Sequence, residues 1–333
     1  MAERENTPTA RTVTSHNQWT RRQVIKTGMI AALPLAVTTR ATAGPHPKAR
    51  KTPAIGMSTL GFGELTNQQL AKQLAANGIH VIQLFLNQTD SRYWKYNGRS
   101  DVSDLTADRC TAIAAAYRDA GIQIQGLGVY TNLIHPDAAE RKANLEYFEA
   151  MMKVGRHMEV NVFITEAGHY HGEGPAPVVP YCFQEPVWYR MVETGKQLAR
   201  IAERYNATVL FEAFYRGFLA SAKRTRLFLE AVDSPHIRAL LDPANLLEIN
   251  DLGEMFGQLG PWIDCLHAKD RKLHVDRGVP AGQGDLDYPT FVKLAAARTP
   301  DAPLILEYVG SKDYRQALAH LRNAMRGGLG SAP

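Results

Sequence analysis

From Pro53 onward, short apolar segments of strand length alternate with longer segments that have the spacing of amphipathic helices. This alternation predicts eight strands, and each strand is followed by a helix. Eight such units over about 275 residues are typical of a closed (β/α)8 barrel, and a doubly wound parallel sheet is the alternative fold. The expected strands are residues 55–62, 80–86, 122–129, 160–166, 208–214, 237–242, 263–267 and 304–308.

Sequence signals at the ends of the helices support the same alternation. Thr66 and Gln69 form a capping box, and Thr106 is suited to the N-cap of the next helix. Two long amphipathic helices are expected over residues 138–158 and 186–205. No Gly-x-Gly-x-x-Gly motif follows the first strand, which disfavours a dinucleotide-binding sheet.

The beginning of the chain has the pattern of an export signal. Arg21 and Arg22 precede an uncharged, weakly apolar stretch at residues 27–39, and small residues follow as far as Ala43. This pattern resembles a twin-arginine signal peptide, and the apolar stretch is shorter than the roughly 20 residues of a permanent membrane span. We therefore expect a cleavable signal at residues 1–43, a linker at 44–54 and a single-domain barrel at 55–328. The expected partner is the twin-arginine export machinery, and the expected location is the periplasm or the cell exterior.

Composition and charge narrow the choice of partner. The chain has 333 residues, of which 45% are hydrophobic, so it can bury a large core. Its formal net charge is +5, but residues 1–43 carry +4 of this, which leaves +1 for the remainder. A nearly neutral mature chain gives little electrostatic basis for binding nucleic acid. The oligomeric state is left open, and a homo-oligomer is one option.

Each of the last four expected strands carries one side chain near its C-terminal end that can bind a metal ion. They are Glu212, Asp242, His267 and Glu307. In a barrel the C-terminal ends of the strands converge on one mouth, and strand alternation places each of these side chains on a buried face. Buried charges need a partner or a cation. Three carboxylates and one imidazole suit one divalent ion, with Mn²⁺ as the first choice and Mg²⁺ or Co²⁺ as alternatives.

Other polar and aromatic side chains are expected at the same mouth. His169 and His171 are either a metal-binding pair or part of a polar loop that lines the cleft, and the loop is favoured because loops seldom hold two ligands rigidly. Tyr93, Trp94 and Tyr96 form either an aromatic wall for a sugar or an ordinary surface turn. The residues expected to bind substrate are Lys269, Asn245, Glu166, His169, Arg271 and Trp94.

Several segments resemble the xylose isomerase-like sugar phosphate isomerase/epimerase superfamily, over about residues 55–325. The resemblance implies a (β/α)8 TIM barrel that binds one divalent ion through Glu212, Asp242, His267 and Glu307. It also implies a small-molecule carbohydrate as substrate. In ketose epimerases of the superfamily the two glutamates also serve as the acid/base pair. The segments that carry the resemblance are the Glu212 strand and residues 128–136, 164–168, 240–246, 267–270, 282–287 and 304–308.

One position departs from the pattern of the sugar epimerases, which commonly have a histidine three residues after the metal-binding aspartate. This chain has Asn245 there, and asparagine cannot carry a proton at neutral pH. The first expectation is an isomerase or epimerase that acts on a hydroxy-ketone sugar or cyclitol through an enediolate. The second is a lyase or dehydratase that eliminates water or an alcohol from a keto-sugar, keto-glycoside or keto-inositol.

Two further classes rank lower. A non-catalytic, exported carbohydrate-binding protein is disfavoured because both Glu212 and Glu307 are present. The abasic-site endonucleases of the same superfamily need several metal ions and a basic DNA-binding face, and the small charge of the mature chain argues against them.

Overall fold

The computed structural model describes residues 52–171, 177–275 and 277–329. These residues belong to one compact unit, Ala49–Pro333. The expected signal at residues 1–43 and most of the expected linker at 44–54 lie outside the described residues. Within the described part of the chain, no helix has both the length and the apolar character needed to cross a membrane.

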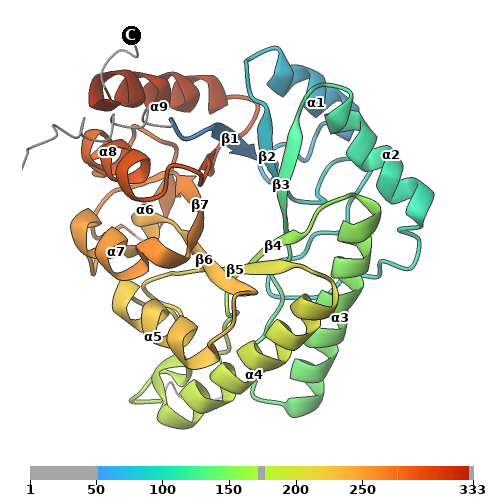
Figure 1. The fold of residues 1–333 in the computed structure, drawn as a ribbon, viewed down its shortest axis with the longest axis vertical. Coiled ribbons are helices and arrows are strands. Elements are labelled where there is room, and N and C mark those ends of the chain that lie inside the picture. The colour runs from blue at the N-terminus through green and yellow to red at the C-terminus, as the bar shows by residue number, and fades with distance from the viewer. Residues whose placement is uncertain (1–51, 172–176, 276, 330–333) are drawn as a thin grey trace, which may run out of the picture. The chain divides into compact units, whose positions relative to one another are not determined.

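Eight parallel strands close into a barrel in the order β1-β10-β7-β6-β5-β4-β3-β2 (Figure 1). The ring closes because β1 (Ile55–Ser58) pairs with both β2 (Val81–Leu84) and β10 (Leu304–Leu306). The predicted (β/α)8 barrel is therefore confirmed, and the alternative of a doubly wound sheet is wrong because such a sheet has two free edges. The remaining strands are β3 (Gln123–Gly128), β4 (Val162–Thr165), β5 (Thr208–Glu212), β6 (Ile237–Leu241) and β7 (Ile263–Ala268).

Helices surround the strands on the outside of the ring (Figure 1). Thr66 and Gln69 form the predicted capping box, and Thr106 accepts a hydrogen bond from the backbone of the next helix, as expected. The outer helices are α1 (Asn67–Ala75), α2 (Ala107–Arg118), α3 (Ala138–His157), α4 (Glu185–Arg204), α5 (Ala222–Val232), α7 (Leu252–Leu259), α8 (Tyr288–Arg298) and α9 (Tyr314–Leu329).

Some short elements at the strand ends are not predicted by the sequence pattern. A four-residue helix, α6 (Pro243–Leu246), directly follows β6. An antiparallel pair, β8 (Asp270–Arg271) with β9 (Gly278–Val279), follows β7. Two 3-10 turns, η1 (Tyr181–Phe183) and η2 (Gly260–Trp262), precede α4 and β7. The pattern misses all of these because each is too short to show a hydrophobic period.

The apolar side chains form two layers. The larger layer lies between the strands and the outer helices, and a smaller cluster fills the inside of the barrel. The inner cluster contains Leu210, Leu240, Cys265 and Ile305, each of which lies two residues before one of the expected metal ligands. Because side chains alternate along a strand, the four ligands share the inward face with these residues and lie above them at the mouth.

Candidate metal centre and substrate pocket

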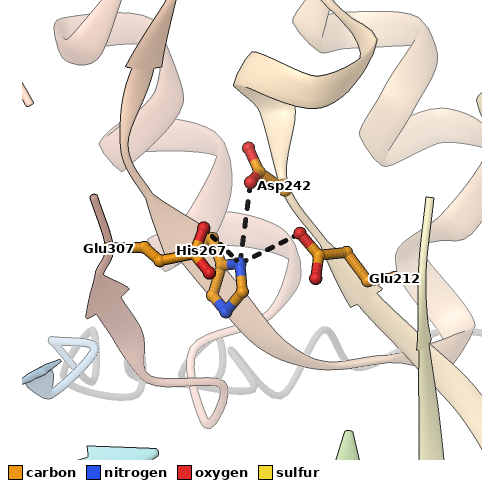
Figure 2. Close-up of side chains that lie close together, drawn as sticks. All are labelled: Glu212, Asp242, His267 and Glu307. Atoms are coloured by element: carbon orange, nitrogen blue, oxygen red, sulfur yellow. Dashed lines mark hydrogen bonds and ion pairs between the residues drawn. The ribbon is translucent and has the colours of Figure 1, made fainter. Parts of the chain in front are cut away.

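The four expected metal ligands converge at the mouth of the barrel (Figure 2). Glu212 is the last residue of β5, and His267 lies in β7, while Asp242 and Glu307 directly follow β6 and β10. All four side chains are buried, and each offers one ligand atom so placed that the four atoms lie within 4.8 Å of one another. Residues from four strands thus meet at a single point.

His267 lies at the centre of this cluster. Its Nδ1 atom lies 3.3 Å from Glu212 Oε1, 3.4 Å from Glu307 Oε2 and 3.6 Å from Asp242 Oδ2 (Figure 2). Its Nε2 atom lies 2.7 Å from Gln83 Oε1. An amide oxygen can only accept a hydrogen bond, so Nε2 carries a hydrogen and the Nδ1 lone pair of the neutral ring faces the carboxylates.

The cluster fits one divalent cation. Ligand atoms bound at about 2.1 Å to one ion lie roughly 3 Å apart when adjacent, which is close to the separations around His267. The three carboxylates and the ammonium of Lys269 carry a net charge of −2 while His267 is neutral, and one divalent ion balances this charge. Three oxygens and one imidazole nitrogen also suit such an ion.

Before a cation binds, the same contacts shift the pKa of two of the ligands. Burial opposes protonation of His267, but Glu307 and Glu212 outweigh it and raise the pKa of His267 to about 10. Burial also opposes ionisation of Asp242, but the charges of Lys269 and His267 lower the pKa of Asp242 to about 2. A proton on His267 therefore stands in for part of the charge that a metal ion would supply.

Neighbouring side chains hold the carboxylates in place. Glu212 accepts hydrogen bonds from the Tyr130 hydroxyl at 2.7 Å and from Asn245 Nδ2 at 2.8 Å. The Oδ1 atom of Asp242 caps α6 by accepting from the backbone of Asn245, which leaves Oδ2 to face His267. Lys269 Nζ lies 2.8 Å from Asp242 Oδ2 and 3.0 Å from Glu307 Oε2. Each carboxylate thus has at least one fixed partner.

A cavity of about 400 Å³ lies beside the cluster, and we call it the reaction cavity. Glu212, Glu307 and Lys269 line it on the side of the metal ligands. The rest of its lining is largely aromatic and consists of Phe85, Trp94, Tyr96, Tyr130 and Tyr308, with Leu60 and Glu166. A cavity of this size with convergent polar groups is suited to a small polar molecule.

Glu166 directly follows β4 and lines this cavity. Its Oε2 atom accepts a hydrogen bond from the Tyr96 hydroxyl at 2.9 Å. Burial, assisted by the charge of Glu212, raises the pKa of Glu166 to about 8 before a cation binds. This carboxyl group therefore holds its proton more strongly than an ordinary glutamate does, which suits it to act as an acid.

Four of the six expected substrate-binding residues line the cavities, and the other two bind parts of the site itself. Trp94 and Glu166 line the reaction cavity, and His169 lines the neighbouring space. Lys269 also lines the reaction cavity, but its ammonium binds two metal ligands. Asn245 binds Glu212. The buried guanidinium of Arg271 donates to the backbone oxygens of Ala244 and Val275, so Arg271 supports the segment after Asp242 instead of lining the reaction cavity.

In the aromatic segment after β2, two of the tyrosine and tryptophan rings lie at the cavity and one anchors a turn. Trp94 and Tyr96 line the reaction cavity and form part of a wall, with their ring centroids 6.3 Å apart. Tyr93 is buried elsewhere, and its hydroxyl donates to Asp104 at 2.9 Å, so it anchors the turn.

Three residues of the site are not among the functional residues expected from the sequence. Gln83 orients His267, Tyr130 binds Glu212, and the ring centroid of Tyr308 lies 4.3 Å from Lys269 Nζ. Gln83 is a polar residue on a buried strand face, and this pattern is the one signal that could have identified it. Tyr130 and Tyr308 follow strands, where tyrosines are common for many reasons.

Comparison with known proteins agrees with this geometry. The chain belongs to the xylose isomerase-like TIM barrel family, whose model matches residues 71–324. No curated protein matches the sequence significantly.

Solved structures with a similar fold include three enzymes by their descriptions. A 3-keto-D-glucoside 4-epimerase from E. coli has a TM-score of 0.66 at 15% identity, covering 82% of this chain and 100% of its own. A D-psicose 3-epimerase from Clostridium cellulolyticum H10 has a TM-score of 0.63 at 15% identity, covering 83% and 98%. A probable 3-DHS dehydratase from Bacillus anthracis has a TM-score of 0.64 at 17% identity, covering 81% and 97%. At these identities the likeness concerns the fold.

Proposed function

We propose that this protein is a divalent-metal-dependent isomerase or epimerase that acts on a hydroxy-ketone sugar or cyclitol. One observation carries the proposal: Glu212 and Glu307 both belong to the ion-binding cluster and both line the reaction cavity. The similar folds of two sugar epimerases support it. We propose Mn²⁺ as the ion, with Mg²⁺ or Co²⁺ as alternatives.

A bound divalent ion would polarise the carbonyl group of the substrate and so acidify the neighbouring C–H bond. In the proposed reaction, one glutamate removes this proton to give an enediolate, and the other returns a proton from the opposite face. Tyr130 and Asn245 hold Glu212 in place, and Lys269 holds Glu307.

A second candidate is elimination of water or an alcohol from a keto-sugar, keto-glycoside or keto-inositol. Elimination begins with the same proton removal as epimerisation, and the position of Glu166 supports it as a candidate. This group has a raised pKa and lines the same cavity, so it can protonate a leaving oxygen. The similar fold of a probable dehydratase is consistent with this candidate.

Incubation of the metal-loaded protein with keto-sugars and keto-glycosides in D₂O tests both candidates. Deuterium at one carbon with no loss of a group indicates isomerisation or epimerisation, and release of water or an alcohol indicates elimination. Glu212→Gln and Glu307→Gln should abolish either reaction. Glu149→Gln is the matched control, because Glu149 binds Tyr205 and Arg204 on the outer helices. Binding without any exchange would instead indicate a carbohydrate-binding protein without catalytic activity.

We also propose that the protein is exported by the twin-arginine route, on the evidence of Arg21 and Arg22. Replacement of both arginines with lysine should leave the precursor in the cytoplasm. Cell fractionation of the wild type and the double variant measures this, and equal export of the two would contradict the proposal.

A further inference from the structure

Two more cavities continue from the reaction cavity. The first, which we call the adjoining cavity, has a volume of about 270 Å³ and shares Tyr96, Glu166 and Glu212 with the reaction cavity. The second, the outer cavity, has a volume of about 580 Å³ and shares His169 and His171 with the adjoining cavity. The three cavities therefore form a row that begins at the metal ligands and continues past His169.

His169 stands where the adjoining and outer cavities meet, and its backbone is fixed by two asparagines. Its N–H donates to Asn97 Oδ1 at 3.1 Å, and its carbonyl accepts from Asn97 Nδ2 at 3.1 Å and from Asn132 Nδ2 at 2.9 Å. The preceding Gly168 has φ +83°, and a Cβ there would lie 2.6 Å from Asn132 Oδ1. These contacts therefore fix the backbone of His169, although loops in general position their residues less precisely than helices and strands do.

The imidazole of His169 remains available for a ligand. Its ring centroid lies 5.3 Å from that of Tyr96 and 5.6 Å from that of His171, and among the described residues it makes no side-chain hydrogen bond. Tyr96 is 48% exposed although its hydroxyl is bound to Glu166. A fixed, partly exposed pair of rings is thus presented directly beside the reaction cavity.

The linings of the two further cavities suit the apolar face and the hydroxyl groups of a sugar ring, respectively. The adjoining cavity is bounded by the partly exposed rings of Tyr96 and Phe214, which offer apolar faces. The outer cavity is bounded by polar groups, including Arg99 and Asn132. Asn132 is buried, and its Oδ1 atom has no hydrogen-bond donor among the described residues. A sugar ring has an apolar face that packs on aromatic rings and a rim of hydroxyl groups that donate hydrogen bonds.

We infer that the substrate carries a second sugar ring, as in a keto-disaccharide, and that His169 and Tyr96 bind this second ring beside the reaction cavity. This inference rests on the proposed function, because it places the keto ring at the metal ligands. His169 is a specificity-determining residue in this arrangement, since it contacts the ring that does not react. The free monosaccharide fills only the reaction cavity and leaves the other two to solvent.

The test compares two probes: methyl 3-keto-glucoside, which has one sugar ring, and 3-keto-cellobiose with the ketone on its non-reducing ring. Deuterium incorporation in D₂O measures the first step for both probes. We expect kcat/KM to be about tenfold higher for the disaccharide, which corresponds to about 1.4 kcal/mol from the second ring. His169→Ala should lower kcat/KM of the disaccharide about tenfold more than that of the methyl glycoside, and so remove this preference.

His80→Ala is the matched control, because His80 is an exposed histidine just before β2, at the opposite end of the strand from the mouth. His80→Ala should leave kcat/KM unchanged for both probes. Equal kcat/KM values for the two probes, or an equal loss for both probes in His169→Ala, would overturn the inference.

Calorimetric titration of the metal-loaded protein with the same probes separates this inference from the proposed function. Tighter binding of the disaccharide that depends on His169, without deuterium exchange, would support the second-ring site and refute the proposed reaction. Exchange without any preference for the disaccharide would support the reaction and refute the site.

Discussion

The hydroxyl of Tyr130 offers the sharpest test of the metal centre. It donates to Glu212 Oε2 at 2.7 Å, and the side chains of both residues are buried, with Tyr130 6% and Glu212 4% exposed. Tyr130→Phe keeps the ring in the lining of the reaction cavity and removes only the oxygen. The variant thus leaves one oxygen of a buried metal ligand without its donor.

The expected loss follows from the charge and burial of this contact. A hydrogen bond to a charged group contributes about 1.5–3 kcal/mol, and each 1.4 kcal/mol is about tenfold in affinity. Loss of an outer partner of a metal ligand typically weakens metal binding about 10–100-fold. We therefore expect the Kd for Mn²⁺ to rise about 10–100-fold in Tyr130→Phe.

Calorimetric titration with Mn²⁺ near neutral pH measures this Kd. Tyr117→Phe is the matched control, since it removes a buried hydroxyl that donates to Asn67 at 2.9 Å, on helices outside the barrel. That variant should lose some stability and keep its affinity for Mn²⁺. If the two variants bind Mn²⁺ with equal affinity, the Tyr130 hydroxyl does not position Glu212 as a ligand of the ion.

Three further predictions concern charge at the site. Because the pKa of His267 is raised to about 10, binding of one ion near neutral pH should release about one proton. The measured binding enthalpy should then depend on the ionisation enthalpy of the buffer. A binding enthalpy that is the same in all buffers would contradict this prediction. The pKa of Glu166 is raised from 4.5 to about 8, so its protonated form favours the fold and its contribution to stability is lost as the pH rises through that range. Denaturant unfolding with a chelator present should therefore show a smaller fall in stability between these pH values for Glu166→Gln, and identical slopes would refute this. Lys269→Met leaves two buried carboxylates without their shared cation and should destabilise the metal-free protein by about 3–5 kcal/mol. Added Mn²⁺ should then raise the melting temperature more in the variant than in the wild type, and equal increases would argue against the charge balance.

The convergence of the four expected metal ligands could be predicted from the sequence because strand periodicity is a strong constraint. Leu210 and Glu212, like Cys265 and His267, are two residues apart, and a period of two fixes them on the same face whatever the exact bounds of the strand. In a closed barrel, that face at the C-terminal end of each strand leads to one mouth. The predicted fold and the period of two were therefore sufficient to predict that the four side chains meet at one mouth.

The partners of those ligands could not be predicted, because they depend on side-chain contacts between distant segments. Gln83 lies 184 positions before His267, and no local pattern links the two residues. Lys269 was expected at the substrate and lines the reaction cavity, but no sequence pattern indicates that its ammonium lies between two carboxylates. Arg271 was also expected there, and the short helix α6, which sequence patterns do not reveal, accounts for its position because Ala244 of that helix binds its guanidinium.

The departure at Asn245 now has a physical explanation. Its side chain donates to Glu212 Oε1 at 2.8 Å, while its backbone N–H donates to the carboxylate of Asp242. One residue therefore fixes two of the expected metal ligands. An amide donates this hydrogen bond at every pH, whereas the donor capacity of a histidine changes with its protonation. Because Asn245 cannot move a proton, the proton transfers of the proposed reaction fall to the carboxyl groups that line the cavity: Glu212 and Glu307 of the ion-binding cluster, and Glu166, which accepts a hydrogen bond from Tyr96.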